Sequence, residues 1–287
     1  MRRVVLVLAT MALAVLLAGG VAQAVINGEP DRGPDAHRFV GALVTVPPSG
    51  EFKGQRIPVC SGTLISPKVF LTAGHCTDLL TREDLPTYVS FDPTYKPKAS
   101  KTIKATPHTH PTFCFPNSEN KGECTPSGRP EIVGSLARDI RYDVGVAVLD
   151  EPVRMASYGA LPVAGLVDTL EVGQRLTAVG YGTTGYEIGG GSSRPQLVYP
   201  RDRNSATVRL LDTSDALSGM FVKTTGVNFV NGKGEGSCKG DSGGPLFVPD
   251  QQTIVGVTSF GYSVCRGSVY YQRTDLPVVL KWVRSFP

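Results

Sequence analysis

Residues 239–245 read KGDSGGP, a stretch that places one serine, Ser242, between an aspartate and two glycines. A third glycine, Gly240, lies two residues before the serine. Glycine permits sharp turns and the close approach of other groups, but it favours neither a strand nor a helix. The same composition is typical of an ordinary turn. The stretch therefore raises the question of what must approach Ser242 so closely.

These residues also satisfy the pattern G-x-S-x-G, which marks the serine nucleophile of α/β-hydrolases. That class needs an acid and then a histidine after the serine. The four histidines, His37, His75, His108 and His110, all precede Ser242. The order of the residues therefore excludes the α/β-hydrolase interpretation.

A serine hydroxyl is a poor nucleophile unless a base takes its proton, so a catalytic Ser242 needs one of the four histidines. His75 is the best candidate, because in LTAGHC (residues 71–76) it follows an apolar strand and precedes a cysteine that would fix its backbone. His37 lies near the expected mature terminus, and His108 and His110 lie in a polar loop. The alternative for His75 is a packed or exposed histidine at a strand end.

The imidazole in turn needs a carboxylate that holds its tautomer and stabilises its charged form. Asp143 opens the apolar run DVGVAVL (residues 143–149), which would bury it at the head of a strand. A buried charge is costly unless it is paired. Asp139 and Asp150 are nearby alternatives that fit surface loops, and neither opens the run directly.

The chain begins with two arginines, a mostly apolar run over residues 4–18 and small residues that end in Ala22-Gln23-Ala24. This pattern predicts a secretory signal peptide over residues 1–24, so that the mature chain starts at Val25 and is secreted. A membrane anchor is the alternative, but it needs roughly 20 apolar residues and usually lacks the small-residue site. Since no second long apolar segment follows, we expect no membrane association after cleavage.

The net charge of +4 is too small to form an electrostatic footprint for nucleic acid. All six cysteines follow the signal, and an even count in an exported chain favours disulfides. HTHPTFC (residues 108–114) with Cys124 resembles a set of metal ligands, but an oxidising compartment favours a loop closed by a disulfide. We therefore predict neither a metal nor another cofactor.

Short β-branched runs alternate with the 33 glycines and 22 prolines, and many short strands with few helices indicate an all-β barrel or sandwich. One helix is predicted in DLPVVLKWVRSF (residues 275–286), with an edge strand as the alternative, although Pro277 suits a first helical turn. Residues 92–131 and 183–202 are rich in Pro, Gly and polar residues and predict surface loops. Strands are predicted at residues 39–46, 68–73, 143–149, 175–182, 245–248 and 253–260.

LTAGHC, DVGVAVL and GDSGGP, in the order His, Asp, Ser, closely resemble the catalytic blocks of chymotrypsin-like (trypsin-family) serine proteases. Supporting matches are VING (25–28), CSGTLIS (60–66), VGYG (179–182) and TSFG (258–261). The resemblance implies two six-stranded antiparallel β-barrels with a C-terminal helix and a site in the cleft between them. We expect one barrel in residues 25–160 and the other in residues 161–287. It also implies an endopeptidase with polypeptide substrates and protein inhibitors as partners; a monomer is the default.

Carried over by position, the resemblance makes Ser242 the nucleophile, His75 the general acid and base, and Asp143 the orienting carboxylate. The N–H groups of Gly240 and Ser242 would form the oxyanion hole, and Gly240 would let its amide point into the cleft. Asp241 would pair with the α-ammonium of the mature terminus at Val25. We therefore hypothesise that signal cleavage itself creates the activating ammonium.

The resemblance also implies the disulfides Cys60–Cys76 and Cys238–Cys265, and it leaves Cys114 and Cys124 to close their own loop. The family pattern likewise identifies a set of substrate-binding residues. Gly236 would form the base of the primary pocket, with Gly261 and Ser268 on its walls. Ser259 to Gly261 would be the edge that pairs with substrate backbone. The full predicted set is Gly236, Ser237, Lys239, Ser259, Phe260, Gly261 and Ser268.

Small neutral walls favour an uncharged, medium or large apolar side chain in the primary pocket. Glu235, next to Gly236, offers the alternative of a preference for basic residues, and the segment after Cys265 is shorter than in typical members. Two other functions use the same fold: a catalytically silent binding protein and an acyl hydrolase that acts on esters.

Overall fold

The computed structural model describes residues 25–34, 36–114, 140–183, 185–187, 196–198, 202–214, 219–262 and 265–287. Three predictions therefore fall on residues outside this range. They are the signal peptide at residues 1–24, the role of Cys124 as a disulfide partner and the alternative acid Asp139.

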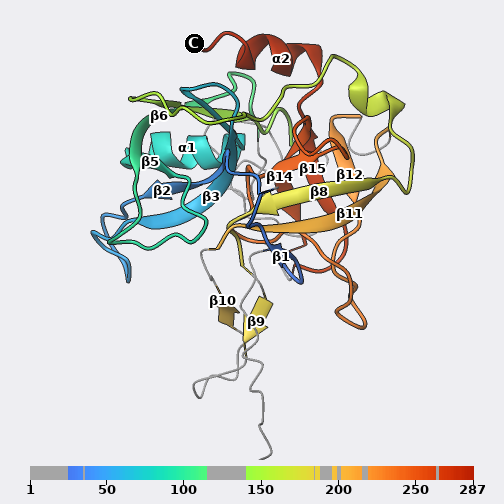
Figure 1. The fold of residues 1–287 in the computed structure, drawn as a ribbon, viewed down its shortest axis with the longest axis horizontal. Helices are drawn as coiled ribbons and strands as arrows, with labels where there is room; N and C mark the ends of the chain where they lie inside the picture. Colours follow the sequence, from blue (N-terminus) through green and yellow to red (C-terminus); the bar gives the residue numbers. More distant parts are fainter. Residues whose placement is uncertain are drawn as a thin grey trace, which may run out of the picture.

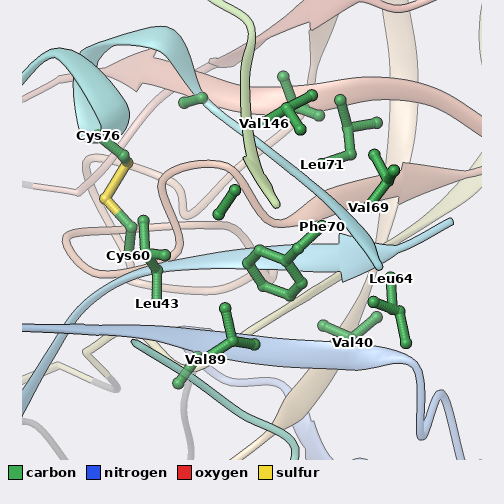
Figure 2. Packing of buried hydrophobic residues seen from close by; sticks show 14 of the residues in the cluster. Val40, Leu43, Cys60, Leu64, Val69, Phe70, Leu71, Cys76, Val89 and Val146 are labelled. Atoms are coloured by element: carbon green, nitrogen blue, oxygen red, sulfur yellow. A yellow bond between two sulfur atoms is a disulfide. The ribbon is translucent and has the colours of Figure 1, made fainter. Parts of the chain in front are cut away.

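The first half of the chain forms a closed barrel (Figure 1). Its interior holds apolar side chains from facing strands, among them Leu43, Phe70, Val89 and Val146 (Figure 2). The nine-residue helix α1 (Gly74–Arg82) follows β4 directly. In barrel order the strands are β2 (Val40–Thr45), β3 (Ile57–Leu64), β4 (Val69–Thr72), β7 (Gly145–Leu149), β6 (Ile103–Thr109) and β5 (Thr87–Ser90).

The second half forms another barrel, which closes because β11 pairs with both β12 and β8. Two-residue β1 (Glu29–Pro30) adds to β11, and β9 (Gly185–Glu187) pairs with β10 (Gln196–Val198) outside the barrel. A short 3₁₀ helix, η2, spans Leu166–Thr169. In barrel order the strands are β8 (Arg175–Gly180), β11 (Asn204–Asp212), β12 (Phe221–Thr224), β15 (Val269–Arg273), β14 (Ile254–Gly261) and β13 (Pro245–Phe247).

The C-terminal helix α2 (Pro277–Val283) follows the second barrel in sequence but packs on the first. The ring of Trp282 lies 5.0 Å from that of His110, and Phe286 lies 5.1 Å from His108. The two histidines of HTHPTFC thus contact aromatic rings of the C-terminal segment. Figure 1 shows α2 above the junction of the barrels.

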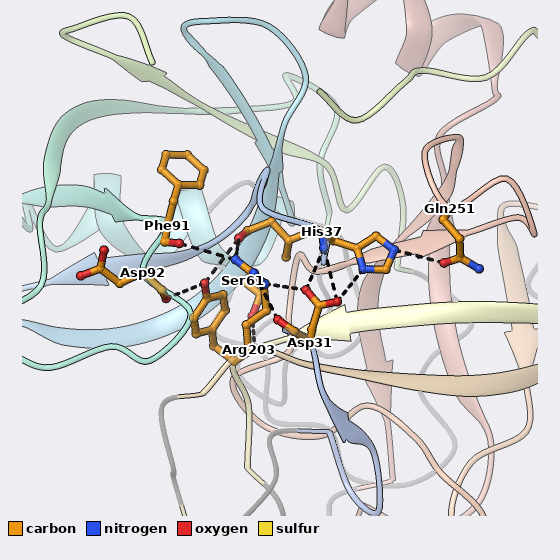
Figure 3. Close-up of polar contacts among 9 residues, drawn as sticks. Asp31, His37, Ser61, Phe91, Asp92, Arg203 and Gln251 are labelled. Carbon is orange, nitrogen blue, oxygen red and sulfur yellow. Dashed lines mark hydrogen bonds and ion pairs between the residues drawn. The ribbon is translucent and has the colours of Figure 1, made fainter. Parts of the chain in front are cut away.

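A buried polar network ties the start of the described chain to both barrels (Figure 3). The Arg203 guanidinium donates to Asp31 Oδ2 at 2.6 Å and to the carbonyl of Val40 at 3.3 Å. His37 Nδ1 lies 2.8 Å from Asp31 Oδ1, and its ring stacks on Phe247 at 5.0 Å. Burial would raise the pKa of Asp31, but His37 and Arg203 hold it below its usual value, so the carboxylate stays ionised.

The predicted two-barrel all-β fold, the six predicted strands and the terminal helix are confirmed. The prediction that residues 92–131 form only a surface loop is wrong, because β6 lies within them and pairs with both β5 and β7 in the first barrel. Helix α1 was not predicted. The expected boundary between residues 160 and 161 falls between the last strand of one barrel and the first strand of the other, and it stays a prediction.

Candidate active site

The ends of two paired strands bring His75 and Asp143 together. Strand β4 pairs with β7 so that Thr72 lies opposite Gly145; His75 follows the first strand and Asp143 precedes the second. His75 Nδ1 lies 2.9 Å from Asp143 Oδ2, and the His75 N–H donates to Asp143 Oδ1 at 2.7 Å. Both carboxylate oxygens therefore bind the same residue, which fixes the imidazole and its tautomer.

Asp143 is completely buried, and the second barrel supplies further partners. The Ser259 hydroxyl donates to Asp143 Oδ2, and the Asp143 N–H donates to Gln272 Oε1 at 3.0 Å. Burial would raise the pKa of Asp143, but the adjacent His75 and the hydrogen bonds keep it below the usual value. Burial likewise opposes the charged form of His75, but the Asp143 charge raises the pKa of the imidazole above 6.5. The pair is thus arranged to stabilise a protonated imidazole.

The Ser242 loop, residues 239–245, packs against the first barrel near the end of β4, the strand that precedes His75. The Ser61 N–H donates to the Ser242 carbonyl at 2.8 Å, and Cys76 Sγ lies 3.8 Å from that oxygen. Gly243 has φ +79°, and a Cβ there would lie 2.1 Å from Thr72 Oγ1. Part of the answer to the glycine question is therefore the first barrel itself, whose backbone and side chains leave no space behind the serine.

Two of the predicted disulfides are present, Cys60–Cys76 beside His75 and Cys238–Cys265 beside the Ser242 loop. Cys114 is also disulfide-bonded, and its predicted partner Cys124 lies outside the described residues.

Asp241 is also buried, but its described hydrogen-bond donors carry no charge. Its carboxylate accepts hydrogen bonds from the N–H groups of Gly182 and Cys238, each at 2.8 Å. Burial raises the pKa of Asp241 to about 7, and the two N–H groups offset this only in part. Val25 is completely buried, and Ile26 pairs with Gly236 through N–H···O bonds of 3.0 and 3.3 Å. The segment predicted to begin the mature chain thus lies beside the segment that leads to Asp241.

A pocket of about 260 Å³ opens next to Ser242. Five of the seven predicted substrate-binding residues line it as part of a larger set. That set is Ser237, Cys238, Lys239, Ser242, Thr258, Ser259, Phe260, Gly261, Tyr262, Cys265 and Val269. The hydroxyl of one lining residue, Ser237, lies 2.9 Å from the hydroxyl of the buried Tyr271.

Two predicted pocket residues do not line this pocket. Val269 lies opposite Gly261 in the β14–β15 pairing and takes the wall position that we expected for Ser268. Gly236 lies behind the lining, where a Cβ would come 2.9 Å from Gly226 Cα. The offset at Ser268 arises because the hairpin register, not the count from Cys265, decides which residue faces Gly261.

Glu235 does not serve this pocket in the structure. Its carboxylate accepts a hydrogen bond from the Thr207 N–H at 2.6 Å, and the side chain lines a separate pocket with Glu29 and His37. The geometry therefore favours a neutral primary pocket over one that pairs with basic residues.

Sequence reasoning missed Ser61, Gln272, Val269 and Tyr271 as contributors to the site. Ser61 was noted only as part of CSGTLIS, and the strand VYYQR of β15 was not predicted at all. A prediction of that strand would have placed Val269 and Tyr271 on one face, because alternate residues of a strand point the same way, with Gln272 on the other.

Comparison with known proteins agrees with this geometry. The family model described as Trypsin matches residues 45–283. The chain is 24% identical over 236 residues to mouse kallikrein 1-related peptidase b1, covering 79% of each chain. It is 26% identical to snake venom serine protease KN5 of Trimeresurus stejnegeri, covering 80% of this chain and 74% of that protein.

Two further comparisons extend over nearly the whole chain. Trypsin theta of Drosophila melanogaster is 23% identical and covers 99% of this chain and 97% of its own. The solved structure of human heparin binding protein superposes with a TM-score of 0.58 at 16% identity, covering 91% and 96%. With the family model matching most of its length, the chain belongs to the trypsin family of chymotrypsin-like serine proteases.

Proposed function

We propose that this protein is a secreted serine endopeptidase in which Ser242, His75 and Asp143 form the catalytic triad. The observation that carries the proposal is the buried Asp143 carboxylate holding both the Nδ1 and the N–H of His75, next to the Ser242 loop. Names of relatives that include kallikrein, venom protease and trypsin support a hydrolase that acts on polypeptides.

In this mechanism the Ser242 hydroxyl attacks the scissile carbonyl carbon while His75 Nε2 takes its proton. The oxyanion of the tetrahedral intermediate binds the N–H groups of Gly240 and Ser242. When the C–N bond breaks, the imidazolium returns the proton to the leaving amine and an acyl-enzyme remains. Water then attacks the ester with His75 as base, which releases the acid and restores the Ser242 hydroxyl. Asp143 stays ionised and stabilises the imidazolium in both halves.

Activation follows from the second buried carboxylate. Cleavage after Ala24 would leave an α-ammonium at Val25 that pairs with Asp241 and holds in place the oxyanion loop, residues 240–242. The run of Ile26 beside Gly236 and the burial of Val25 support this proposal.

Secretion is supported by the disulfides, since these persist in oxidising compartments. Within the described part of the chain, neither helix is long and apolar enough to cross a bilayer.

Labelling with a serine-directed fluorophosphonate tests the nucleophile. We expect rapid labelling of the folded, cleaved protein and none of Ser242→Ala, while Ser66→Ala, which removes a turn hydroxyl, labels like the unaltered protein. Labelling that persists in Ser242→Ala would refute the assignment. A folded protein that neither labels nor cleaves peptides or esters would favour the silent binding protein, and cleavage of esters alone would favour the acyl hydrolase.

The pocket predicts cleavage after an uncharged apolar residue, limited in size by Val269. Replacing Val269 by Gly removes that wall, so kcat/KM for Phe relative to Val at this position should rise about tenfold. Ser268→Ala, at the neighbouring residue, should leave the ratio unchanged. A peptide library read by mass spectrometry measures both, and a strict preference for Arg or Lys would contradict the neutral-pocket proposal.

A further inference from the structure

Ser61 contacts both residues whose N–H groups would bind the oxyanion. Its N–H donates to the Ser242 carbonyl at 2.8 Å, and its hydroxyl donates to the Gly240 carbonyl at 2.8 Å. The residue is completely buried in β3 of the first barrel, whereas Gly240 and Ser242 belong to the second half of the chain. Ser61 therefore connects the oxyanion loop to the opposite barrel.

The Ser61 hydroxyl has a single orientation available to it. Its oxygen accepts a hydrogen bond from the Tyr181 N–H at 2.9 Å, so its proton is directed to the Gly240 carbonyl. Tyr181 is itself held, because its hydroxyl donates to the Asp92 carbonyl at 2.9 Å. Figure 3 draws Ser61 together with this network, which continues to Arg203 and Asp31.

Gly240 needs such a restraint. It adopts φ +94°, a conformation that a residue with a side chain rarely takes, and glycine can leave it at little steric cost. The peptide bond before Gly240 is fixed where the Lys239 carbonyl accepts from the Thr183 N–H at 2.8 Å. The peptide bond after Gly240 is fixed by the Ser61 hydroxyl. The two bonds together determine where the Gly240 N–H points.

We propose that Ser61 is a positioning residue for the oxyanion hole: its hydroxyl holds the Gly240 carbonyl so that the Gly240 N–H is preorganised for the transition state. This inference rests on the proposed function. A donor that stabilises only the transition state raises kcat and leaves ground-state binding unchanged.

The test compares Ser61→Ala with Ser90→Ala in the cleaved protein. Ser61 and Ser90 lie on either side of Ala42 in the pairing of β3 and β5 with β2. Both are completely buried, but the Ser90 hydroxyl has no described partner. We expect Ser61→Ala to lower kcat about tenfold with KM unchanged, less than the direct loss of an oxyanion donor. Ser90→Ala should keep the kcat of the unaltered protein.

A pair of inhibitors separates positioning from a general loss of structure. A peptide aldehyde forms a hemiacetal whose oxygen would occupy the oxyanion hole, whereas the matching peptide alcohol binds without that bond. We expect Ser61→Ala to lower the affinity for the aldehyde by the same factor as kcat and to leave the affinity for the alcohol unchanged. Ser61→Thr, which retains the hydroxyl, should restore kcat and the aldehyde affinity. Should Ser61→Ala not fold, Ser61→Gly deletes the same hydroxyl and is read in the same way.

If the variant lacking the hydroxyl has the same kcat and the same aldehyde affinity as the unaltered protein, the role of Ser61 is overturned and the proposed triad is unaffected. Equal weakening of aldehyde and alcohol would also overturn it, because it would show a merely structural effect. Failure of the unaltered protein to label or cleave would instead refute the proposed function.

Discussion

Asp143 and Asp241 are both completely buried beside Ser242, yet their surroundings act on them in opposite directions. Asp143 faces an imidazole, a hydroxyl and an N–H group, and its pKa lies below the usual value. Asp241 has only two N–H groups to offset burial, and its pKa rises to about 7. Hydrogen bonds alone therefore do not keep a buried carboxylate ionised here, whereas a group that can carry positive charge does.

The difference indicates when each carboxylate gains its charged partner. Asp143 has its partner as soon as the first barrel and the adjoining strands fold. Asp241 lacks a described cationic partner, and the proposed ammonium of Val25 exists only after cleavage. In the proposed mechanism one aspartate thus serves the reaction and the other serves its activation.

Replacing Asp143 by Asn should have the largest effect. Because the amide neither stabilises an imidazolium nor holds the correct tautomer, kcat should fall about 10⁴-fold with the fold retained. Asp78→Asn is the matched control, since Asp78 is an acid of α1 that pairs with Arg82 at 2.8 Å. Steady-state kinetics measure both, and a loss of less than a hundredfold at Asp143 would argue against its role.

Blocking the new terminus at Val25 should have the second-largest effect on kcat. A chain that retains Ala24 before Val25 should have kcat about a hundredfold lower than one that starts at Val25, because the oxyanion loop loses its ion pair. N-terminal sequencing of the secreted protein should accordingly give Val25 first. A start well before or after it would remove this activation scheme.

The two forms should also differ in how stability depends on pH. In the uncleaved form the folded pKa of Asp241 is about 7 against 3.8 for the free group, so folding favours the protonated acid. The contribution of Asp241 to the free energy of unfolding is complete below pH 3.8 and is lost as the pH rises toward 7. The cleaved form should lack this loss, and Asp241→Asn should abolish the difference between the forms. Thermal melts from pH 4 to 8 measure it.

Gly182→Ala should displace the Asp241 carboxylate without touching the triad. A Cβ at Gly182 would lie 2.5 Å from Asp241 Cγ, so overpacking should destabilise the protein by about 1–3 kcal/mol. We expect roughly tenfold lower kcat in the cleaved form, as the oxyanion loop shifts. Gly173→Ala is a useful control, because a Cβ there meets open space, although its φ of +89° carries some strain. Equal kcat in both variants would contradict the prediction.

The smallest expected effect concerns the acid limb of the pH profile of kcat/KM. Since only neutral His75 accepts the Ser242 proton, activity should fall as pH drops through a pKa above 6.5. Asp143 stays ionised over that range. Asp78 also raises the pKa of His75, so Asp78→Asn should move the limb a few tenths of a pH unit lower. A limb below pH 6.5 in the unaltered protein would show that Asp143 does not act on the imidazole as described.

Sequence patterns predicted an all-β barrel or sandwich because the core strands carry apolar runs bounded by turn residues, as in β7 and β14, and the family resemblance then specified two barrels. Strand β6 escaped prediction because its sequence, IKATPHT, buries only Ala105 fully. Helix α1 begins with glycine and contains two threonines, which are poor helix formers, so tertiary contacts of Cys76 and Leu80 decide its structure.

The pocket was less predictable than the triad for a geometric reason. Short blocks predict His75, Asp143 and Ser242 as the triad, but the residue opposite Gly261 depends on an irregularity in the β14–β15 register between Thr258 and Phe260. The family pattern from which Ser268 was predicted does not reveal such a shift, whereas the register places Val269 opposite Gly261. The role proposed for Ser61 likewise depends on contacts between barrels that no local pattern encodes.

The ion pair between Asp31 and Arg203 anchors the chain only a few residues after Val25. In the proposed activation scheme the tether to the new terminus is therefore short, so the α-ammonium would reach Asp241 at an effective concentration far above that of any free amine in solution. Once the chain is cleaved, formation of the ion pair with Asp241 should then be first-order and independent of dilution. Added dipeptides that imitate the Val-Ile end should compete with it only weakly.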